Sequence, residues 1–320
     1  MDNQVTDLKP IHLPQHFNYV AVFLSFACML RCSYCINHHG GDLVKKRWMS
    51  GEDWIRGLNR LHTRGIALTL QGGEPTVHKN FYEIIAGINN QLPIDLLTNL
   101  ELDPDEFMRR IPKDRIKRDA PYASIRVSYH KDQQDPVKLL NRVKYLQDHG
   151  YSVGVWVVDH PDYLEHTREV QAMAKGMGID FRLKEFLGPH QGINYGTMRY
   201  PNAVNAKELR SCDCRTSELL IDPGGYIYRC HSDLYANRLS IGHILDVDPP
   251  ASLGAWMPCQ VYGKCNSCDI KVKNNRFQQF GHSSVEIKNI SAPYAQNKEY
   301  VVEVANTYGK QDAKTADINH

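Results

Sequence analysis

Six short β-prone runs alternate with amphipathic helical segments between residues 17 and 187, and this alternation constrains the fold more than any other feature. Strands that alternate with helices build a parallel sheet with right-handed crossovers. The expected strands span residues 19–26, 66–71, 94–99, 123–129, 152–158 and 179–186. The expected helices span 51–64, 79–90, 104–111 and 163–175, with another that places Val137, Leu140 and Val143 on one face. The sequence therefore predicts an α/β fold in which six β/α units curl into a partial (β/α)6 barrel.

The polar residues of these strands fall on the side that faces away from the helices. The apolar positions of each strand should pack against the helices, so the alternate positions should face the barrel interior. Expected interior residues are Ser124, Arg126, Ser128, Arg182, Lys184, Thr69, Gln71 and Asn99. Buried charges need partners, so we expect a wet interior that binds polar, partly anionic ligands. The alternative is that the cations pair with acidic neighbours such as Asp95 and Glu185.

Cys28, Cys32 and Cys35 follow the first expected strand, with three and then two residues between them. A loop with this spacing can direct three thiolates at one metal centre. A structural zinc site has four protein ligands, whereas a cubane iron–sulfur cluster held by three cysteines keeps one iron open for another ligand. The alternatives are a zinc site or three unrelated buried thiols.

With the aromatic residue Tyr34 before the third cysteine, this C-x3-C-x2-C run resembles the signature of the radical S-adenosylmethionine (radical SAM) enzymes. The resemblance implies a TIM-like partial barrel, in agreement with the strand pattern. It also implies that Cys28, Cys32 and Cys35 hold a [4Fe–4S] cluster, that SAM binds the open iron, and that Tyr34 lies beside the adenine. Electron transfer from such a cluster cleaves SAM to a 5′-deoxyadenosyl radical, which abstracts hydrogen from a substrate.

Gly72, Gly73 and Glu74 follow the second expected strand and precede Pro75. Two glycines let a backbone approach a ligand closely, and a carboxylate can accept hydrogen bonds from an ammonium group. An ordinary glycine turn could have the same sequence. The run resembles the Gly-Gly-Glu-Pro element of the radical SAM family, which implies that Gly72, Gly73 and Glu74 contact the amino group of SAM.

Further site residues are expected inside the barrel and at the ends of its strands. Asn99 and Ser128 end the third and fourth strands, where barrels present functional groups, and the family often contacts the SAM ribose or carboxylate from such positions. Arg126 is a third expected cofactor contact, because it should face the interior. Lys184 and Glu185 end the sixth strand and are the expected proton acceptors.

The C-terminal part of the chain carries six further cysteines: Cys212, Cys214, Cys230, Cys259, Cys265 and Cys268. Cys265 and Cys268 form a C-x2-C knuckle, and Cys230 follows an expected hairpin strand. The arrangement resembles the SPASM extension of radical SAM enzymes in its shortened twitch form. This resemblance implies one auxiliary [4Fe–4S] cluster held by Cys212, Cys230, Cys265 and Cys268. Cys214 is an alternative to Cys212, Cys259 is expected to be a buried thiol, and a zinc ribbon is an alternative to the cluster because four thiolates also suit zinc.

Composition divides the chain into five expected segments: a polar N-terminal segment (1–16), the barrel (17–187), a linker that also lines the active site (188–211), the twitch-like extension (212–282) and a polar, partly disordered tail (283–320). Neither a signal peptide nor a membrane span of about 18 apolar residues is recognisable. Nine cysteines without a secretion signal indicate a reducing compartment, so we expect a cytoplasmic protein. The formal net charge of +2 gives no indication of a nucleic-acid partner.

The family resemblance leaves the substrate open. The cationic interior, and the short stretch 1–27 before Cys28, favour a small polar substrate such as a sugar or an aminocyclitol, with peptide maturation as the alternative. The expected reaction is dehydrogenation, in which the auxiliary cluster takes an electron, or epimerisation, in which Cys214 or Cys259 returns a hydrogen atom.

Flavodoxin or ferredoxin is the expected electron donor. Molybdenum-cofactor-type cyclases end in Gly-Gly, whereas this chain ends in Ile-Asn-His, which disfavours that relative. The alternative from another class is a zinc-stabilised binding protein without catalytic activity.

Overall fold

In the computed structural model, nine strands form one sheet in the order β14-β13-β12-β2-β4-β5-β6-β7-β8. The structure describes residues 7–39, 48–204, 208–238, 240–273 and 281–292. Six consecutive neighbours in this sheet are parallel: β2 (Tyr19–Ser25), β4 (Leu68–Gly72), β5 (Ile94–Thr98), β6 (Ile125–Tyr129), β7 (Val153–Asp159) and β8 (Phe181–Glu185). The α/β fold with a mostly parallel sheet is confirmed, and it is consistent with a partial TIM-like barrel.

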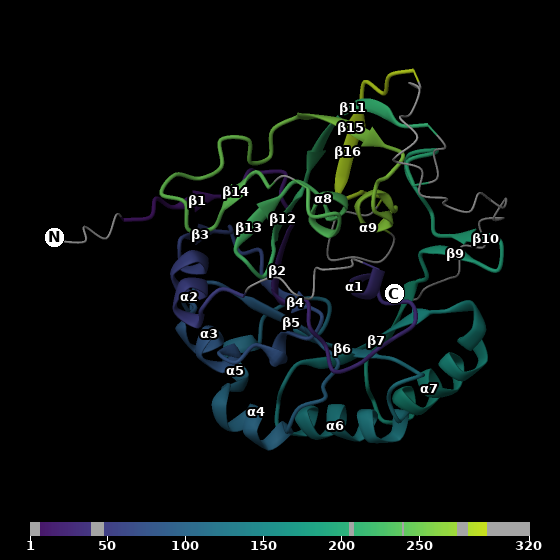
Figure 1. Cartoon of the computed structure of the whole chain (residues 1–320). Helices are drawn as coiled ribbons and strands as arrows, with labels where there is room; N and C mark the ends of the chain where they lie inside the picture. The colour runs from purple at the N-terminus through teal and green to yellow at the C-terminus, as the bar shows by residue number, and fades with distance from the viewer. Residues whose placement is uncertain (1–6, 40–47, 205–207, 239, 274–280, 293–320) are drawn as a thin grey trace.

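Helices cover the outer face of this sheet as an arc (Figure 1). They are α2 (Gly51–Asn59), α3 (Phe81–Gly87), α4 (Pro104–Arg110), α5 (Lys113–Ile116), α6 (Pro136–Asp148) and α7 (Leu164–Gly176). Their apolar faces pack on alternate strand residues such as Val20, Val22 and Leu70 to form the main hydrophobic core. Asp103 and Asp135 accept backbone hydrogen bonds at the starts of α4 and α6, and the proline that follows each of them suits the first helical position.

The expected strands agree with the observed ones to within two residues at each end. The first expected helix ends early, at Asn59, because Leu61–His62 forms the short strand β3 and pairs in parallel with β1 (Ile11–His12). The placement of Val137 was wrong: its side chain is 50% exposed in the first turn of α6. The buried face of that helix is instead formed by Leu139, Leu140, Val143 and Leu146.

Ion pairs occupy the amino ends of the barrel strands, where a wet interior was expected. Arg126 lies near the start of β6 and its guanidinium is 3.1 Å from Oδ2 of Asp95, with both side chains almost fully buried. Arg118 Nε lies 2.6 Å from Oδ1 of the same carboxylate. Arg182 pairs with Asp180 at 2.8 Å. The alternative of paired cations therefore holds for Arg126 and Arg182, although the partner of Arg182 is Asp180 and not Glu185.

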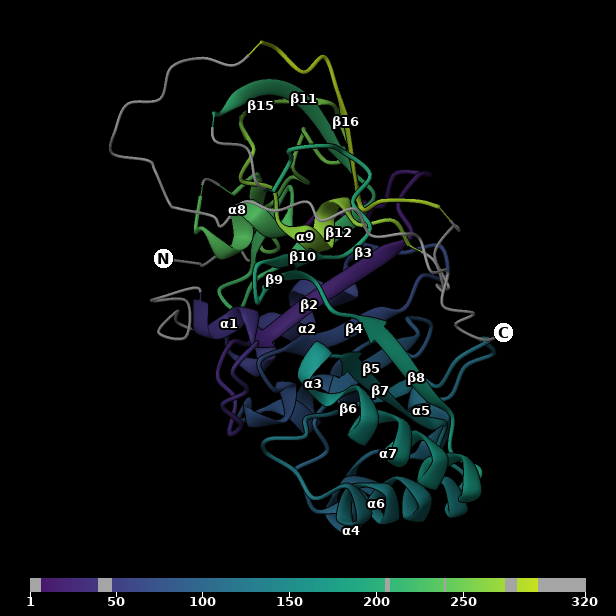
Figure 2. The ribbon, with the colours of Figure 1, turned by 90° about the vertical axis from the view of Figure 1, so that its right-hand side faces the viewer.

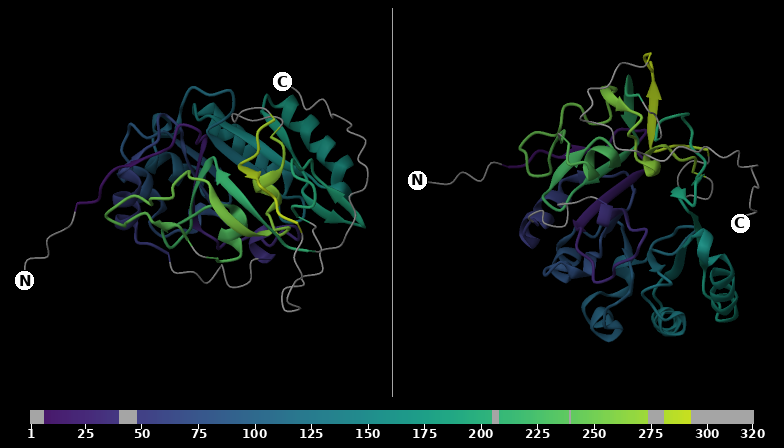
Figure 3. Two further views of the ribbon diagram at one scale, coloured as in Figure 1. Left: turned by 90° about the horizontal axis from the view of Figure 1, so that it is seen from above. Right: turned by 45° about the vertical axis from the view of Figure 1, so that its right-hand side comes forward.

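The cysteine-rich segment continues the barrel sheet. β12 (Glu218–Ile221) pairs in parallel with β2, and β13 (Tyr226–Tyr228) and β14 (Gly242–His243) extend the sheet beyond it. A separate sheet contains β15 (Met257–Tyr262), β11 (Arg210–Thr216) and β16 (Val285–Lys288). It lies at the end of the molecule away from α4 and α6 (Figures 2 and 3). The division between barrel and extension stays a prediction.

Smaller elements complete the described chain. The expected linker contains a hairpin of β9 (Gly188–His190) and β10 (Ile193–Tyr195). Two short helices, α8 (His231–Tyr235) and α9 (Ser267–Ile270), lie beside the C-terminal cysteines, and α1 (Ile36–His39) follows the first cysteine loop. No helix in the described ranges is both long and apolar enough to span a bilayer. Most of the expected tail, residues 293–320, lies outside the described residues.

Candidate active site and metal centres

The first three cysteines lie in a loop after the carboxyl end of β2. Cys32 is buried, and Cys28 and Cys35 are half-buried. Burial raises the pKa of Cys32 to about 12, and the neighbouring thiols of Cys35 and Cys28 add to this increase, so the three sulfurs are close enough to interact. The backbone N–H of Leu30 donates to Cys28 Sγ at 3.4 Å. The loop thus gathers three thiols at the end of the barrel where reacting groups are expected.

Gly72 and Gly73 pack directly against this cysteine loop. A Cβ atom on Gly72 would lie 1.9 Å from the carbonyl oxygen of Ser25, and one on Gly73 would lie 2.3 Å from that of Ala27. The Gly73 N–H also donates to the Ser25 carbonyl at 2.8 Å. The close approach that these glycines allow is therefore to the loop backbone, which explains why side chains are absent here.

The carboxylate of Glu74 is buried and bonded to the protein. Oε1 accepts hydrogen bonds from the hydroxyls of Thr76 and Thr98, both at 2.8 Å, and Oε2 accepts one from the backbone N–H of Asn99 at 2.7 Å. Burial raises the pKa of Glu74, and these hydrogen bonds oppose that effect. The carboxylate joins the ends of β4 and β5, and the expected contact of Glu74 with SAM stays a prediction.

Asn99 contacts the cysteine loop itself. Its Nδ2 lies 3.5 Å from Cys28 Sγ and 3.1 Å from Met29 Sδ, and its Oδ1 accepts a hydrogen bond from Glu101 N–H at 2.9 Å. Ser128 is half-buried on β6, beyond Arg126 toward the carboxyl end. The two strand-end residues are therefore at the cysteine end of the barrel, whereas Arg126 lies toward the opposite end with Asp95.

Tyr34 is held by a histidine that the sequence pattern did not single out. Its hydroxyl lies 3.0 Å from Nδ1 of His130, and its ring centroid is 5.4 Å from that of His160. Burial lowers the pKa of His130 to about 4, and the nearby Lys184 ammonium contributes to this decrease. The His130 imidazole thus contacts Tyr34 and lies near enough to Lys184 to be influenced by its charge. Their place in the sequence could have identified both histidines, because His130 and His160 each directly follow a parallel strand.

Lys184 and Glu185 end β8 as expected, but they have different surroundings. Lys184 is close enough to His130 to affect its pKa, as described above. Glu185 Oε1 accepts hydrogen bonds from the backbone N–H of Thr197 at 2.9 Å and from its hydroxyl at 3.3 Å. Glu185 therefore fastens the segment after β10 to the barrel, and Lys184 is the better placed of the two for chemistry.

Five of the C-terminal cysteines line one small cavity: Cys212, Cys214, Cys230, Cys259 and Cys265. Cys212 and Cys259 face each other across β11 and β15. The neighbouring thiols of Cys212 and Cys214 lower the pKa of Cys259. Cys259 therefore belongs to a cluster of thiols, where an isolated buried thiol was expected.

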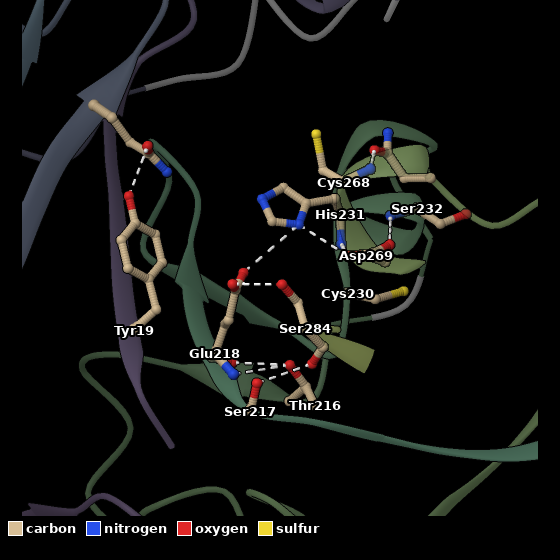
Figure 4. Close-up of polar contacts among 12 residues, drawn as sticks. Tyr19, Thr216, Ser217, Glu218, Cys230, His231, Ser232, Cys268, Asp269 and Ser284 are labelled. Carbon is tan, nitrogen blue, oxygen red and sulfur yellow. Dashed lines mark hydrogen bonds and ion pairs between the residues drawn. The ribbon is translucent and has the colours of Figure 1, made fainter. Parts of the chain in front are cut away.

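Cys268 is directed away from this cavity. Its thiol does not line the cavity, and Figure 4 shows the Cys268 and Cys230 side chains pointing in different directions. Burial raises the pKa of Tyr235, and the thiols of Cys268 and Cys35 both add to this increase. Cys268 thus faces the barrel side of the extension. The expected ligand set is brought together for Cys212, Cys230 and Cys265 but not for Cys268.

Comparison with known proteins identifies a family whose model matches part of this chain. Residues 22–158 match the model of the radical SAM superfamily. An 85-residue stretch is 33% identical to the GTP 3′,8-cyclase of Agrobacterium fabrum and covers 26% of this chain and 24% of that protein. The GTP 3′,8-cyclase of Paenarthrobacter nicotinovorans is 38% identical over 84 residues, which are 24% of this chain and 23% of that protein. The match thus spans about a quarter of the length of these relatives.

Solved structures with a similar arrangement are those of native anSMEcpe with bound AdoMet and Cp18Cys peptide, and of histidine-tagged anSMEcpe with bound AdoMet. The TM-scores are 0.48 and 0.49, and the sequence identities are 14% and 15%. Each alignment covers 76% of this chain and 79% of the other.

The cysteine loop and the glycine pair that packs on it lie within the matched residues, together with strands β4, β5 and β6. The radical SAM superfamily uses SAM and a [4Fe–4S] cluster. Residues 22–158 of this chain therefore match a radical SAM domain.

Proposed function

We propose that this chain is a radical SAM enzyme in which Cys28, Cys32 and Cys35 hold the [4Fe–4S] cluster. The observation that carries the proposal is the placement of these thiols after the carboxyl end of β2, in a loop braced by Gly72 and Gly73. Three clustered cysteine thiols fit such a cluster, and the Leu30 N–H bond to Cys28 Sγ is typical of its protein environment. When bound, the cluster supplies the electron that cleaves SAM to a 5′-deoxyadenosyl radical.

The surrounding residues orient the loop and the cofactor. Asn99 donates to Cys28 Sγ and so fixes that ligand from the end of β5. His130 holds the hydroxyl of Tyr34, which orients the aromatic ring assigned to the adenine. Both contacts are side-chain hydrogen bonds made by the protein alone, so they favour the binding geometry before any ligand arrives.

The second part of the proposal is an auxiliary [4Fe–4S] cluster in the cavity of the extension. The cavity contains Cys212, Cys230 and Cys265 of the expected set. We assign the fourth position to Cys259 instead of Cys268. Cys259 is the cross-strand partner of Cys212, and its thiol also affects the pKa of Cys265, where burial is the largest influence. Four thiols on one cavity also suit zinc, so the metal must be identified by experiment.

The proposed reaction is dehydrogenation of a small polar substrate, with Lys184 as proton acceptor in its neutral amine form and the auxiliary cluster as electron acceptor. Epimerisation is less well supported, because the expected hydrogen donors Cys214 and Cys259 both lie in the cavity with the proposed cluster ligands. The relatives named GTP 3′,8-cyclase make cyclisation of a purine nucleotide the second candidate reaction. A flavodoxin or ferredoxin is the proposed electron donor.

Anaerobic reconstitution followed by incubation with SAM and reductant tests this proposal. We expect a brown protein with about eight irons per chain and formation of 5′-deoxyadenosine. Candidate sugars, aminocyclitols and GTP, each deuterated, should then be compared for transfer of deuterium into 5′-deoxyadenosine. The matched control is the C28A/C32A/C35A variant, which should keep the auxiliary iron and lose SAM cleavage. A colourless protein that binds zinc and leaves SAM intact would contradict the proposal.

A further inference from the structure

The carboxylate of Asp269, a residue of α9, is buried against the first turn of α8. It is 2% exposed. Oδ1 accepts hydrogen bonds from the backbone N–H of His231 and from its Nδ1, both at 2.9 Å, and Oδ2 accepts one from the backbone N–H of Ser232 at 3.0 Å (Figure 4). One carboxylate thus joins α9 to the first turn of α8.

These hydrogen bonds lie beside the proposed metal ligands. Cys230 is the residue that precedes α8 and forms its N-terminal cap. Asp269 lies in α9, four residues after Cys265. The three bonds to Asp269 therefore fix the helical turn that follows Cys230 against the short helix that follows Cys265.

His231 also connects this region to the barrel sheet. The Nδ1 atom that bonds to Asp269 also lies 4.0 Å from Oε2 of Glu218, which is in β12 (Figure 4). Glu218 is 3% exposed, accepts a hydrogen bond from Ser284 Oγ at 2.5 Å and lies 3.8 Å from Lys273 Nζ. Buried charges persist only where they are paired and hydrogen-bonded, so this arrangement holds the imidazole in one position.

We infer that Asp269 is a positioning residue for the auxiliary centre: it sets Cys230 against Cys265 in advance of metal binding, through the backbone of α8 and through the His231 side chain. This inference rests on the proposed auxiliary cluster. Replacing a group that orients a metal ligand through a hydrogen bond lowers the metal affinity by about 10–100-fold. When two ligands are already held in position, less conformational entropy is lost when the metal binds.

The test is the variant Asp269→Asn in the full chain, which keeps the shape of the side chain but turns an NH2 group toward a backbone N–H. We expect the iron content to fall from about eight to about four per chain, with the Cys28 cluster and SAM cleavage retained. Competition with an iron chelator should show about 10–100-fold weaker retention of the auxiliary iron. The electron paramagnetic resonance signal of the second cluster should be lost or changed.

Glu286→Gln is the matched control, because Glu286 is a half-exposed acid of the same extension that pairs with Arg215 at 2.7 Å. It should keep all the iron. Eight irons and an unchanged second signal in Asp269→Asn would overturn the inference. If Asp269→Asn does not fold, His231→Gln must show the same selective loss, and unchanged iron in that variant overturns the inference instead. Wild-type protein with only about four irons would overturn the auxiliary cluster itself, which is a distinguishable result.

Discussion

The hydroxyl of Tyr34 lies 3.0 Å from Nδ1 of His130, so a residue of the cysteine loop is tied to the residue that follows the fourth parallel strand. Replacing His130 by Phe keeps the ring but removes the hydrogen bond. A hydrogen bond of this kind contributes about 0.5–1.5 kcal/mol, so we expect SAM cleavage to slow by about 3–10-fold with unchanged iron content. Formation of 5′-deoxyadenosine measures the effect. His149→Gln, at an exposed position in the barrel, is the control, and an unaffected rate in His130→Phe would show that Tyr34 needs no such support.

Gly73→Ala should prevent assembly of the first cluster. The added methyl group would lie 2.3 Å and 2.4 Å from the carbonyl oxygens of Ala27 and Phe26, and neither backbone atom can move without displacing the cysteine loop. We expect iron to fall from about eight to about four per chain and SAM cleavage to be lost. Gly176→Ala is the control, because no atom lies within 4 Å of its added methyl group. Full iron content in Gly73→Ala would contradict the role assigned to this glycine.

Single alanine variants of Cys259 and Cys268 should differ in their iron content. The Cys259 thiol lines the cavity of the extension and Cys268 does not, so Cys259→Ala should lose about four irons and Cys268→Ala should keep them. Iron analysis and the resonance signal of the second cluster distinguish the two. The reverse result would restore Cys268 as the ligand. Cys214→Ala serves as a third comparison, because Cys214 shares the cavity but is not among the proposed ligands.

Arg126→Met should destabilise the barrel without weakening SAM binding. Loss of one partner from a buried ion pair costs about 3–5 kcal/mol, and we expect the lower end of this range because Asp95 keeps its contact with Arg118. The free energy of unfolding in urea measures the cost. Lys144→Met removes an exposed pair with Asp148 and should cost under about 1 kcal/mol. Weaker SAM binding by folded Arg126→Met would instead support Arg126 as a cofactor contact.

The strands and the cysteine loop could be predicted because each depends on neighbouring residues. Hydrophobic alternation decides which segments become strands, and the spacing of Cys28, Cys32 and Cys35 is complete within eight residues. The side-chain pairs that form between strands could not be predicted in the same way. Arg126 pairs with Asp95, and Glu74 bonds to Thr98, only because neighbouring strands are aligned in register.

The orientation of Cys268 shows the same limit at shorter range. A C-x2-C spacing indicates two thiols that converge on one metal, but α9 begins between the two cysteines, and Cys265 lines the cavity whereas Cys268 does not. His130 was missed for a related reason, because its role depends on Tyr34, which is 96 positions away in the chain.

The parallel pairing of β12 with β2 affects how this protein can be dissected. A fragment that stops at the end of β8 would leave the strand that leads into the cysteine loop with a bare row of peptide groups along one edge. Such edges recruit other chains and promote aggregation. Strand β12 therefore covers the edge of β2, and β13 and β14 extend the sheet beyond it. A shorter clone made to isolate the SAM-binding part should be extended to include residue 243.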